Sequence, residues 1–134
     1  MSQSDRDVLF ANETFVIGML QAVSGGAVVA ALAKSDTLMK LAGDSAFLVF
    51  LSTMALALVF AVLAAYWKHQ YKLWDVKAQA SAVRNVQEET QERSAKANRY
   101  LKGMRIVVVV SLVSIALGVG ELVVSFWFRA LCAS

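Results

Sequence analysis

The sequence predicts an all-α integral membrane protein with three transmembrane helices, the second and third of which extend into a cytoplasmic helical hairpin. Apolar residues make up 58% of the 134-residue chain and charged residues only 17%, a composition typical of membrane proteins. Three segments are apolar and long enough to cross a bilayer. The chain also has neither Gly nor Pro from Ser45 to Leu101, which favours a long continuous helix. We therefore expect a single membrane domain over residues 1–134.

The predicted spans are Phe15 to Ala33, Ser45 to Trp67 and Ile106 to Phe128. At 1.5 Å per residue the last of them covers about 34 Å, which is enough for a bilayer. The chain contains no Pro that would kink a helix. Ala31-Leu32-Ala33 resembles a signal-peptide cleavage site, but the residues before the first span are acidic, whereas a signal peptide begins with basic residues. The first helix is therefore expected to be retained as an anchor.

Basic residues predict the orientation, because Lys and Arg collect on the cytoplasmic side of a membrane. Nine of them lie in the connection 68–105, at positions Lys68, Lys72, Lys77, Arg84, Arg93, Lys96, Arg99, Lys102 and Arg105. The loop 34–44 holds only Lys40, with Lys34 at its edge, and the C-terminal tail holds only Arg129. The connection 68–105 is therefore expected to be cytoplasmic.

Three crossings then fix the sides of the other segments. The N-terminus (1–14) should be cytoplasmic, and the loop 34–44 and the tail 129–134 should face outward from an inner or plasma membrane. Trp67 marks the inner membrane interface and Trp127 the outer one, as expected for interfacial aromatic anchors. The aromatic residues thus agree with the charge distribution.

Local signals predict where the helices begin and how far they run. Asn12 can cap the first helix, and Gly43-Asp44-Ser45 can cap the second. Beyond the second span, residues recur at spacings of four, three and four, which is one face of a helix: Trp67, Tyr71, Trp74 and Ala78. The second helix is therefore expected to continue into the cytoplasm as a stalk.

The stalk must reverse before the third span begins. Asn85 to Ser94 is the most polar stretch of the chain and the best place for this turn. Thr90 or Ser94 can cap the returning helix. The sequence thus predicts a helical hairpin over 68–105 with a polar tip.

Glu121 is the only ionisable side chain inside the predicted spans, and it lies about 6 Å from the middle of the third one. A carboxylate at this depth costs several kcal/mol unless it is protonated, paired or facing water. Four small residues share its helix face at spacings of three and four: Ser111, Ser114, Gly118 and Ser125. We call these five residues the polar stripe, and they form the candidate functional site.

Two interpretations fit the polar stripe. In the first, its small residues let another helix approach closely, and Glu121 is protonated or satisfied by a neighbour. In the second, the stripes of several copies line a hydrated path in which Glu121 is the selectivity or protonation site. The expected partners of Glu121 are hydroxyls at its depth on the second helix and basic side chains reaching in from the outer side: Ser52, Thr53, Lys34 and Arg129.

The first predicted helix has a small face of its own, formed by Gly18, Gln21, Ala22 and Gly25. Gly18-xxx-Ala22 is of the small-xxx-small type that allows transmembrane helices to pack closely. The amide of Gln21 is expected to bond to a neighbouring helix rather than to a ligand. This face is therefore predicted to pack against another helix.

No pattern in the sequence indicates catalysis, a metal site or a cofactor. The chain has one cysteine, Cys132, and one histidine, His69, which excludes an intrachain disulfide and leaves too few ligands for a His/Cys metal site. It has no glycine-rich phosphate loop and no paired carboxylates within the spans. Nucleic acid is not an expected partner, because acidic residues at the hairpin tip dilute its basic charge. The lipid bilayer is an expected partner, and the basic residues of the hairpin suit anionic lipid head groups.

Three functions from different classes can be compared with these features. The first is a homo-oligomeric pore, channel or holin-like protein built around the Glu121 stripe. The second is an accessory or scaffold subunit of a larger membrane complex. The third, an enzyme or a small-molecule carrier, has no site to support it. We expect a non-enzymatic membrane protein that acts through helix–helix assembly, with itself or with other membrane subunits.

Overall fold

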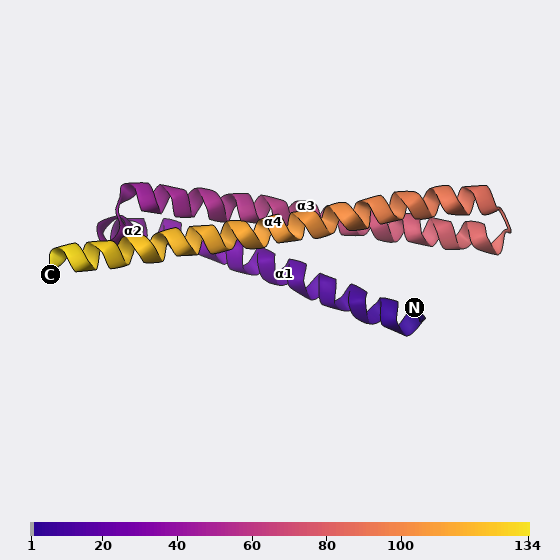
Figure 1. The fold of residues 1–134 in the computed structure, drawn as a ribbon, viewed down its shortest axis with the longest axis horizontal. Coiled ribbons are helices and arrows are strands. Elements are labelled where there is room, and N and C mark those ends of the chain that lie inside the picture. The colour runs from indigo at the N-terminus through magenta and orange to yellow at the C-terminus, as the bar shows by residue number, and fades with distance from the viewer. Residues whose placement is uncertain (1) are drawn as a thin grey trace.

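Residues 2–134, which the computed structural model describes, fold entirely into helices and short connections (Figure 1). In chain order the helices are α1 (Gln3–Ala33), α2 (Ser35–Ala42), α3 (Asp44–Val83) and α4 (Gln87–Ala133). α1, α3 and α4 each contain a stretch that is long and apolar enough to cross a membrane. The predicted all-helical architecture with three long apolar helices is therefore confirmed.

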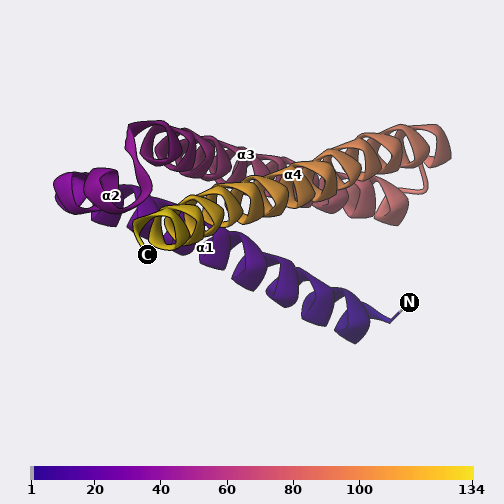
Figure 2. The ribbon, with the colours of Figure 1, turned by 60° about the vertical axis from the view of Figure 1, so that its left-hand side comes forward.

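The long helices form an antiparallel pair crossed by a third helix. α3 and α4 lie side by side over most of their length, and α1 packs mainly against α3 (Figures 1 and 2). The N-terminal end of α1 diverges from the pair, whereas its C-terminal end lies close to it (Figure 1). The short α2 lies near the start of α3 and the C-terminal part of α4. The α3–α4 pair is thus the spine of the molecule.

The α3–α4 contact has the spacing of a coiled coil. Buried positions alternate by three and four on both helices: Phe47, Phe50, Met54, Ala57, Ala61, Ala64 and Lys68 on α3, with Met104, Val107, Ser111, Ser114 and Gly118 on α4. This alternation averages 3.5 residues per turn, which keeps one seam of each helix facing the other. Ala57, Ala61 and Ala64 are completely buried, so small side chains let the two backbones approach closely.

The spine continues beyond the apolar segments as a polar stalk. α3 runs without a break past Trp67 to Val83. The Trp67 ring packs on the backbone of α4, since a Cβ added to Gly103 would lie 2.7 Å from its Cζ3 atom. Further along, the Trp74 ring has the ammonium groups of Lys77 and Lys96 at 4.5 and 4.7 Å from its centre. Aromatic and cation–π contacts therefore replace the small apolar seam where the chain becomes polar.

The predicted start of the first helix is wrong. α1 begins at Gln3 and not near Asn12, because Ser2 and Asp5 form a reciprocal cap. The Ser2 hydroxyl oxygen accepts a hydrogen bond from the Asp5 amide at 3.1 Å, and the Asp5 carboxylate accepts one from the Ser2 amide at 3.0 Å. The polar residues before Phe15 thus extend the helix beyond its apolar part.

The expected loop 34–44 is largely helical. It holds α2, whose Leu38 and Met39 pack against the buried cluster of Phe47, Phe50 and Met54. α3 then begins at Asp44, after Gly43 in a left-handed conformation with φ of 96°. No side chain caps α3 at this point, so the predicted capping by Gly43-Asp44-Ser45 is wrong. Glycine is needed here for its backbone freedom.

The turn between α3 and α4 is shorter than the predicted polar tip. It occupies Arg84 to Val86, with Asn85 in the left-handed region at φ of 58°, a conformation that Asn tolerates better than most residues. Neither Thr90 nor Ser94 caps the returning helix, which begins at Gln87 without a side-chain cap. Arg93 joins the two helices just inside the turn, because its Nη1 donates to Ser81 Oγ at 2.6 Å and to Lys77 O at 3.1 Å.

Candidate functional site

Three polar ends of the apolar segments meet at one level of the molecule. Lys68, which follows the second segment, reaches α1, where its ammonium donates to the carbonyl oxygen of Phe10 at 3.0 Å and to the Thr14 hydroxyl. Arg105, which precedes the third segment, pairs with Glu13 of α1 at 3.7 Å. Since Glu13 and Thr14 directly precede the first segment, all three apolar segments begin or end at this junction.

The opposite ends of the apolar segments also meet. Arg129, just after the third segment, donates from Nη1 to the carbonyl oxygen of Lys40 at 3.3 Å. Its guanidinium lies so close to Gly43 that a Cβ there would overlap it. Polar contacts therefore bring all three apolar segments together at one end, and the second and third segments together at the other.

The polar stripe is divided by its neighbour α3. Ser111 and Ser114 are buried, and the Ser111 hydroxyl donates to the carbonyl oxygen of Ala57 on α3 at 2.9 Å. Gly118 is also buried, and a Cβ there would overlap the Thr53 hydroxyl oxygen. The small residues of the stripe thus let α3 approach α4, which is the packing role of the first interpretation.

Glu121 lies outside this contact. Its side chain is exposed, and Ser125 is half-buried. At about 100° per residue, Glu121 is rotated by about 60° from Gly118 around α4, which carries it past the edge of the α3 contact. Leu117 and Val124, which lie one turn before and one turn after it on α4, are exposed apolar residues. The carboxylate therefore points away from the folded chain, among residues suited to lipid or to another helix.

Within the described part of the chain, Glu121 has no hydrogen bond and no ion pair with any of its four expected partners. Thr53 donates to its own helix, at the carbonyl oxygens of Val49 and Phe50, both at 2.9 Å. Ser52 and Lys34 are exposed, and Arg129 is held at Lys40. Pairing of Glu121 with these residues stays a prediction without support from the single chain.

The packed face of α1 is rotated from the predicted one. Ile17, Leu20, Ser24 and Ala31 are its buried residues. Of the predicted set, Gly25 touches α3, since a Cβ there would lie 3.7 Å from Leu58 Cδ1, and Gln21 is half-buried. Ala22 is exposed, and Gly18 has open space beside it. The spacing of small residues alone therefore missed the larger apolar side chains of Ile17 and Leu20, which are buried in this contact.

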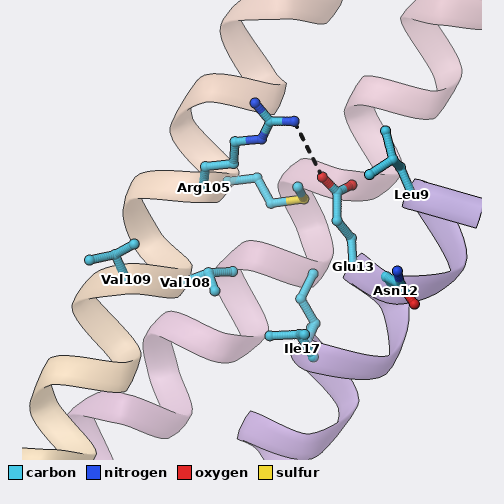
Figure 3. A pocket seen from close by; sticks show the side chains of 9 residues that line it. Leu9, Asn12, Glu13, Ile17, Arg105, Val108 and Val109 are labelled. Carbon is cyan, nitrogen blue, oxygen red and sulfur yellow. Dashed lines mark ion pairs between the residues drawn. The ribbon is translucent and has the colours of Figure 1, made fainter. Parts of the chain in front are cut away.

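Two grooves flank α1 near the junction. The α1–α4 groove has a volume of about 400 Å³ and apolar walls that include Leu9, Val16, Ile17, Val108 and Val109. Figure 3 shows the side chains of Glu13 and Arg105 pointing toward each other across its mouth. The α1–α3 groove has a volume of about 350 Å³ and a more polar lining, which includes Thr14, Gln21, Lys68, His69 and Lys72.

Lys68 is the residue that links α1 to the spine. It is only 7% exposed, and its ammonium lies 4.0 Å from the centre of the Phe10 ring. Burial lowers the pKa of Lys68 below its ordinary value, the nearby Glu13 carboxylate raises it, and the Lys72 ammonium lowers it. Sequence reasoning treated Lys68 as one of many basic residues, because nothing in its neighbours signals a contact to a backbone carbonyl 58 positions away.

Replacing Lys68 with methionine is expected to loosen the N-terminal part of α1. The change keeps the apolar stem but removes the hydrogen bonds to Phe10 and Thr14, which should weaken docking by about 1–3 kcal/mol. Amide hydrogen exchange of the purified protein in detergent should then rise over residues 4–14. Lys102→Met, at an exposed position of α4, is the control and should leave the exchange unchanged. Equal protection in both variants would contradict the linking role of Lys68.

The described residues bring no group of three or more His, Cys, Asp or Glu side chains together in a way that could hold a metal ion. His69 is exposed, and Cys132 is an exposed free thiol.

Comparisons with known proteins assign no family, because no family model, no curated protein and no solved structure matches the chain. The geometry of the chain itself is therefore what supports a function.

Proposed function

We propose that this chain is a non-enzymatic membrane protein that crosses the bilayer three times and acts by assembling with other membrane helices through the exposed face of α4 around Glu121. The N-terminus and the α3–α4 stalk are cytoplasmic in this proposal, and α2 and the C-terminus face outward. The membrane is an inner or plasma membrane. The chain serves as an accessory or scaffold subunit, or as a unit of a homo-oligomer.

The alignment of the apolar segments supports the membrane location. Polar contacts join the ends of all three segments at Lys68, Arg105 and Glu13 on one side, and the ends of the second and third segments at Arg129 on the other. Between them, large apolar side chains such as Leu56, Val59, Leu117 and Val124 are exposed. A layer of exposed apolar residues bounded by charged residues suits a bilayer, where the backbone groups are satisfied within helices.

The exposure of Glu121 is the observation that carries the assembly proposal. An ionisable group at this depth almost always faces a bundle interior or a hydrated cavity. Within the single chain Glu121 does not face the interior of the helix bundle, because α3 covers the polar stripe only as far as Gly118. A second helix placed against this face would remove the carboxylate from lipid and give it a hydrogen-bond partner.

A pore remains a second candidate, because an exposed carboxylate from several copies could border a water path. Ser111, Ser114 and Gly118 support it less well, since they are buried against α3. A path lined by the whole stripe would require α3 and α4 to separate. The packing of α3 thus favours assembly without a stripe-lined pore.

Cysteine cross-linking in native membranes tests the face. In a Cys132→Ser background, which has no other cysteine, Leu117→Cys and Val124→Cys place thiols beside Glu121. Val119→Cys is the control, because Val119 is also exposed but lies about 160° around α4 from Glu121. Disulfide or bifunctional cross-links at 117 and 124 but not at 119 are expected. Cross-links at 119 alone, or at none of the three, would overturn the proposed face.

A further inference from the structure

The α1–α3 groove combines unneutralised positive charge with an open apolar floor. Lys72 is exposed at its rim, with its ammonium 5.2 Å from the centre of the Phe10 ring. Within the described part of the chain Lys72 pairs with no carboxylate. Lys68 forms the wall beside it, and its ammonium has three N–H groups, two of which bond to Phe10 and Thr14. The Lys72 ammonium therefore remains for a ligand, and the largely buried Lys68 ammonium adds positive charge beside it.

The lining of the α1–α3 groove changes from mainly basic to mainly apolar along α1. Its basic residues, Lys68, His69 and Lys72, lie at the junction with Thr14, whereas Ile17, Gly18 and Ala65 lie toward the apolar segments, where the amide of Gln21 is the one polar side chain of the lining. Gly18 has no atom within 4 Å of the place where a Cβ would be, so the groove is not closed by a neighbouring side chain. A ligand with an anionic head and an apolar tail matches this order of surfaces.

We propose that the α1–α3 groove binds one anionic phospholipid, with its phosphate at Lys68 and Lys72 and an acyl chain beside Gly18. The inference rests on the proposed membrane location, which puts Lys68 and Lys72 at the cytoplasmic head-group level. Basic pockets between transmembrane helices on that side bind anionic head groups. A lipid here would bridge α1 and α3 and add to the contacts that Lys68 makes with α1.

The α1–α4 groove does not share this chemistry. Its one cation, Arg105, already pairs with Glu13 at 3.7 Å, and the rest of its lining is almost wholly apolar. An anionic head group would have to displace the Glu13 carboxylate and leave it unpaired. Charge complementarity therefore selects the α1–α3 groove.

Native mass spectrometry of the delipidated full-length protein in detergent tests the site. Phosphatidylglycerol is titrated against phosphatidylcholine of the same chain length, with inorganic phosphate as a third arm. One phosphatidylglycerol should bind at least fivefold more tightly than phosphatidylcholine. Lys72→Gln should weaken it about fivefold, the equivalent of about 1 kcal/mol for one basic residue at the surface. Lys102→Gln, which removes the same charge from α4, should leave binding unchanged.

A second pair of variants tests the acyl chain. Gly18→Leu should fill the groove and weaken binding of both lipids at least fivefold, whereas Gly26→Leu, at the other open glycine of α1, should not. Equal affinity for the two lipids, equal effects of Lys72→Gln and Lys102→Gln, or binding of inorganic phosphate in place of the lipid would each overturn the proposal. Extraction of the wild-type protein by alkaline carbonate would instead overturn the membrane location, so the two failures are distinguishable.

Discussion

Replacing Glu121 with leucine is expected to weaken assembly of the protein roughly 5- to 30-fold, which corresponds to the loss of about 1–2 kcal/mol from an interhelical hydrogen bond in a membrane. The single chain should fold as before, because Glu121 makes no hydrogen bond within residues 2–134 and its side chain is exposed. The fraction of assembled protein, measured by cross-linking in membranes at equal expression, reports the change. Unaltered assembly would mean that the Glu121 carboxylate is not part of the interface.

Two further variants show whether the hydrogen bond or the charge of Glu121 is needed, and whether any lost carboxylate has the same effect. Glu121→Gln keeps a side chain that donates and accepts hydrogen bonds, so a packing contact should largely survive it. A conduit that depends on the charge should instead keep its assembly and lose conductance or pH dependence. Glu88→Leu removes a carboxylate from the stalk tip, far from the apolar segments, and should leave assembly unchanged. Loss of assembly in Glu88→Leu would point to a general charge effect.

Enlarging Gly118 is expected to give the largest loss of stability in the single chain. A Cβ at this position would overlap the Thr53 hydroxyl oxygen and lie 3.1 Å from Met54 Cε. Thr53 cannot easily turn away, because it is β-branched and its hydroxyl bonds to Val49 and Phe50 of its own helix. Gly118→Leu should therefore force α3 and α4 apart and cost about 1–3 kcal/mol, seen as a lower unfolding midpoint in detergent.

Gly120 is the matched control for this substitution. It lies two residues away on α4, and no atom is within 4 Å of where its Cβ would be. Gly120→Leu should therefore leave the unfolding midpoint unchanged or raise it, because leucine favours the helix over glycine. An equal loss in Gly118→Leu and Gly120→Leu would mean that the small residues of the stripe do not set the α3–α4 distance.

The helical fold was largely predictable, because long apolar runs without Pro have few alternatives to a long helix. The lack of Gly and Pro after Ser45 likewise predicted that α3 passes Trp67 without a break. Helix ends were less predictable, since each depends on one local contact. The Ser2–Asp5 cap starts α1 early, and the reversal at Asn85 needs only a few residues instead of a ten-residue polar tip.

The candidate site could be predicted only in part, because periodicity identifies a helix face but not the neighbour that covers it. Ser111, Gly118 and Glu121 share a face by spacing, yet α3 covers the first two and leaves the third exposed. The distinction depends on the α3–α4 register, which Ala57 and Thr53 help to set through Ser111 and Gly118. No property of the α4 sequence alone contains this information.

The contacts of α1 were missed for a related reason. Its buried residues Ile17, Leu20 and Ser24 are spaced by three and four, a pattern that the sequence offers alongside the small face of Gly18 and Ala22. In a span that is apolar all round, several faces satisfy the same periodicity. The choice among them was made by three-dimensional contacts such as the hydrogen bond from Lys68 to Phe10.

The mass of the intact complex, released gently from its native membrane and measured by native mass spectrometry, tests the assembly proposal most directly. The account predicts a species well above the 14.5 kDa of one chain, which Glu121→Leu shifts toward the single chain. Larger, different chains in that species would identify an accessory subunit, and four or more copies of this chain alone would favour the pore. A wild-type protein found only as a single chain would contradict assembly through the Glu121 face.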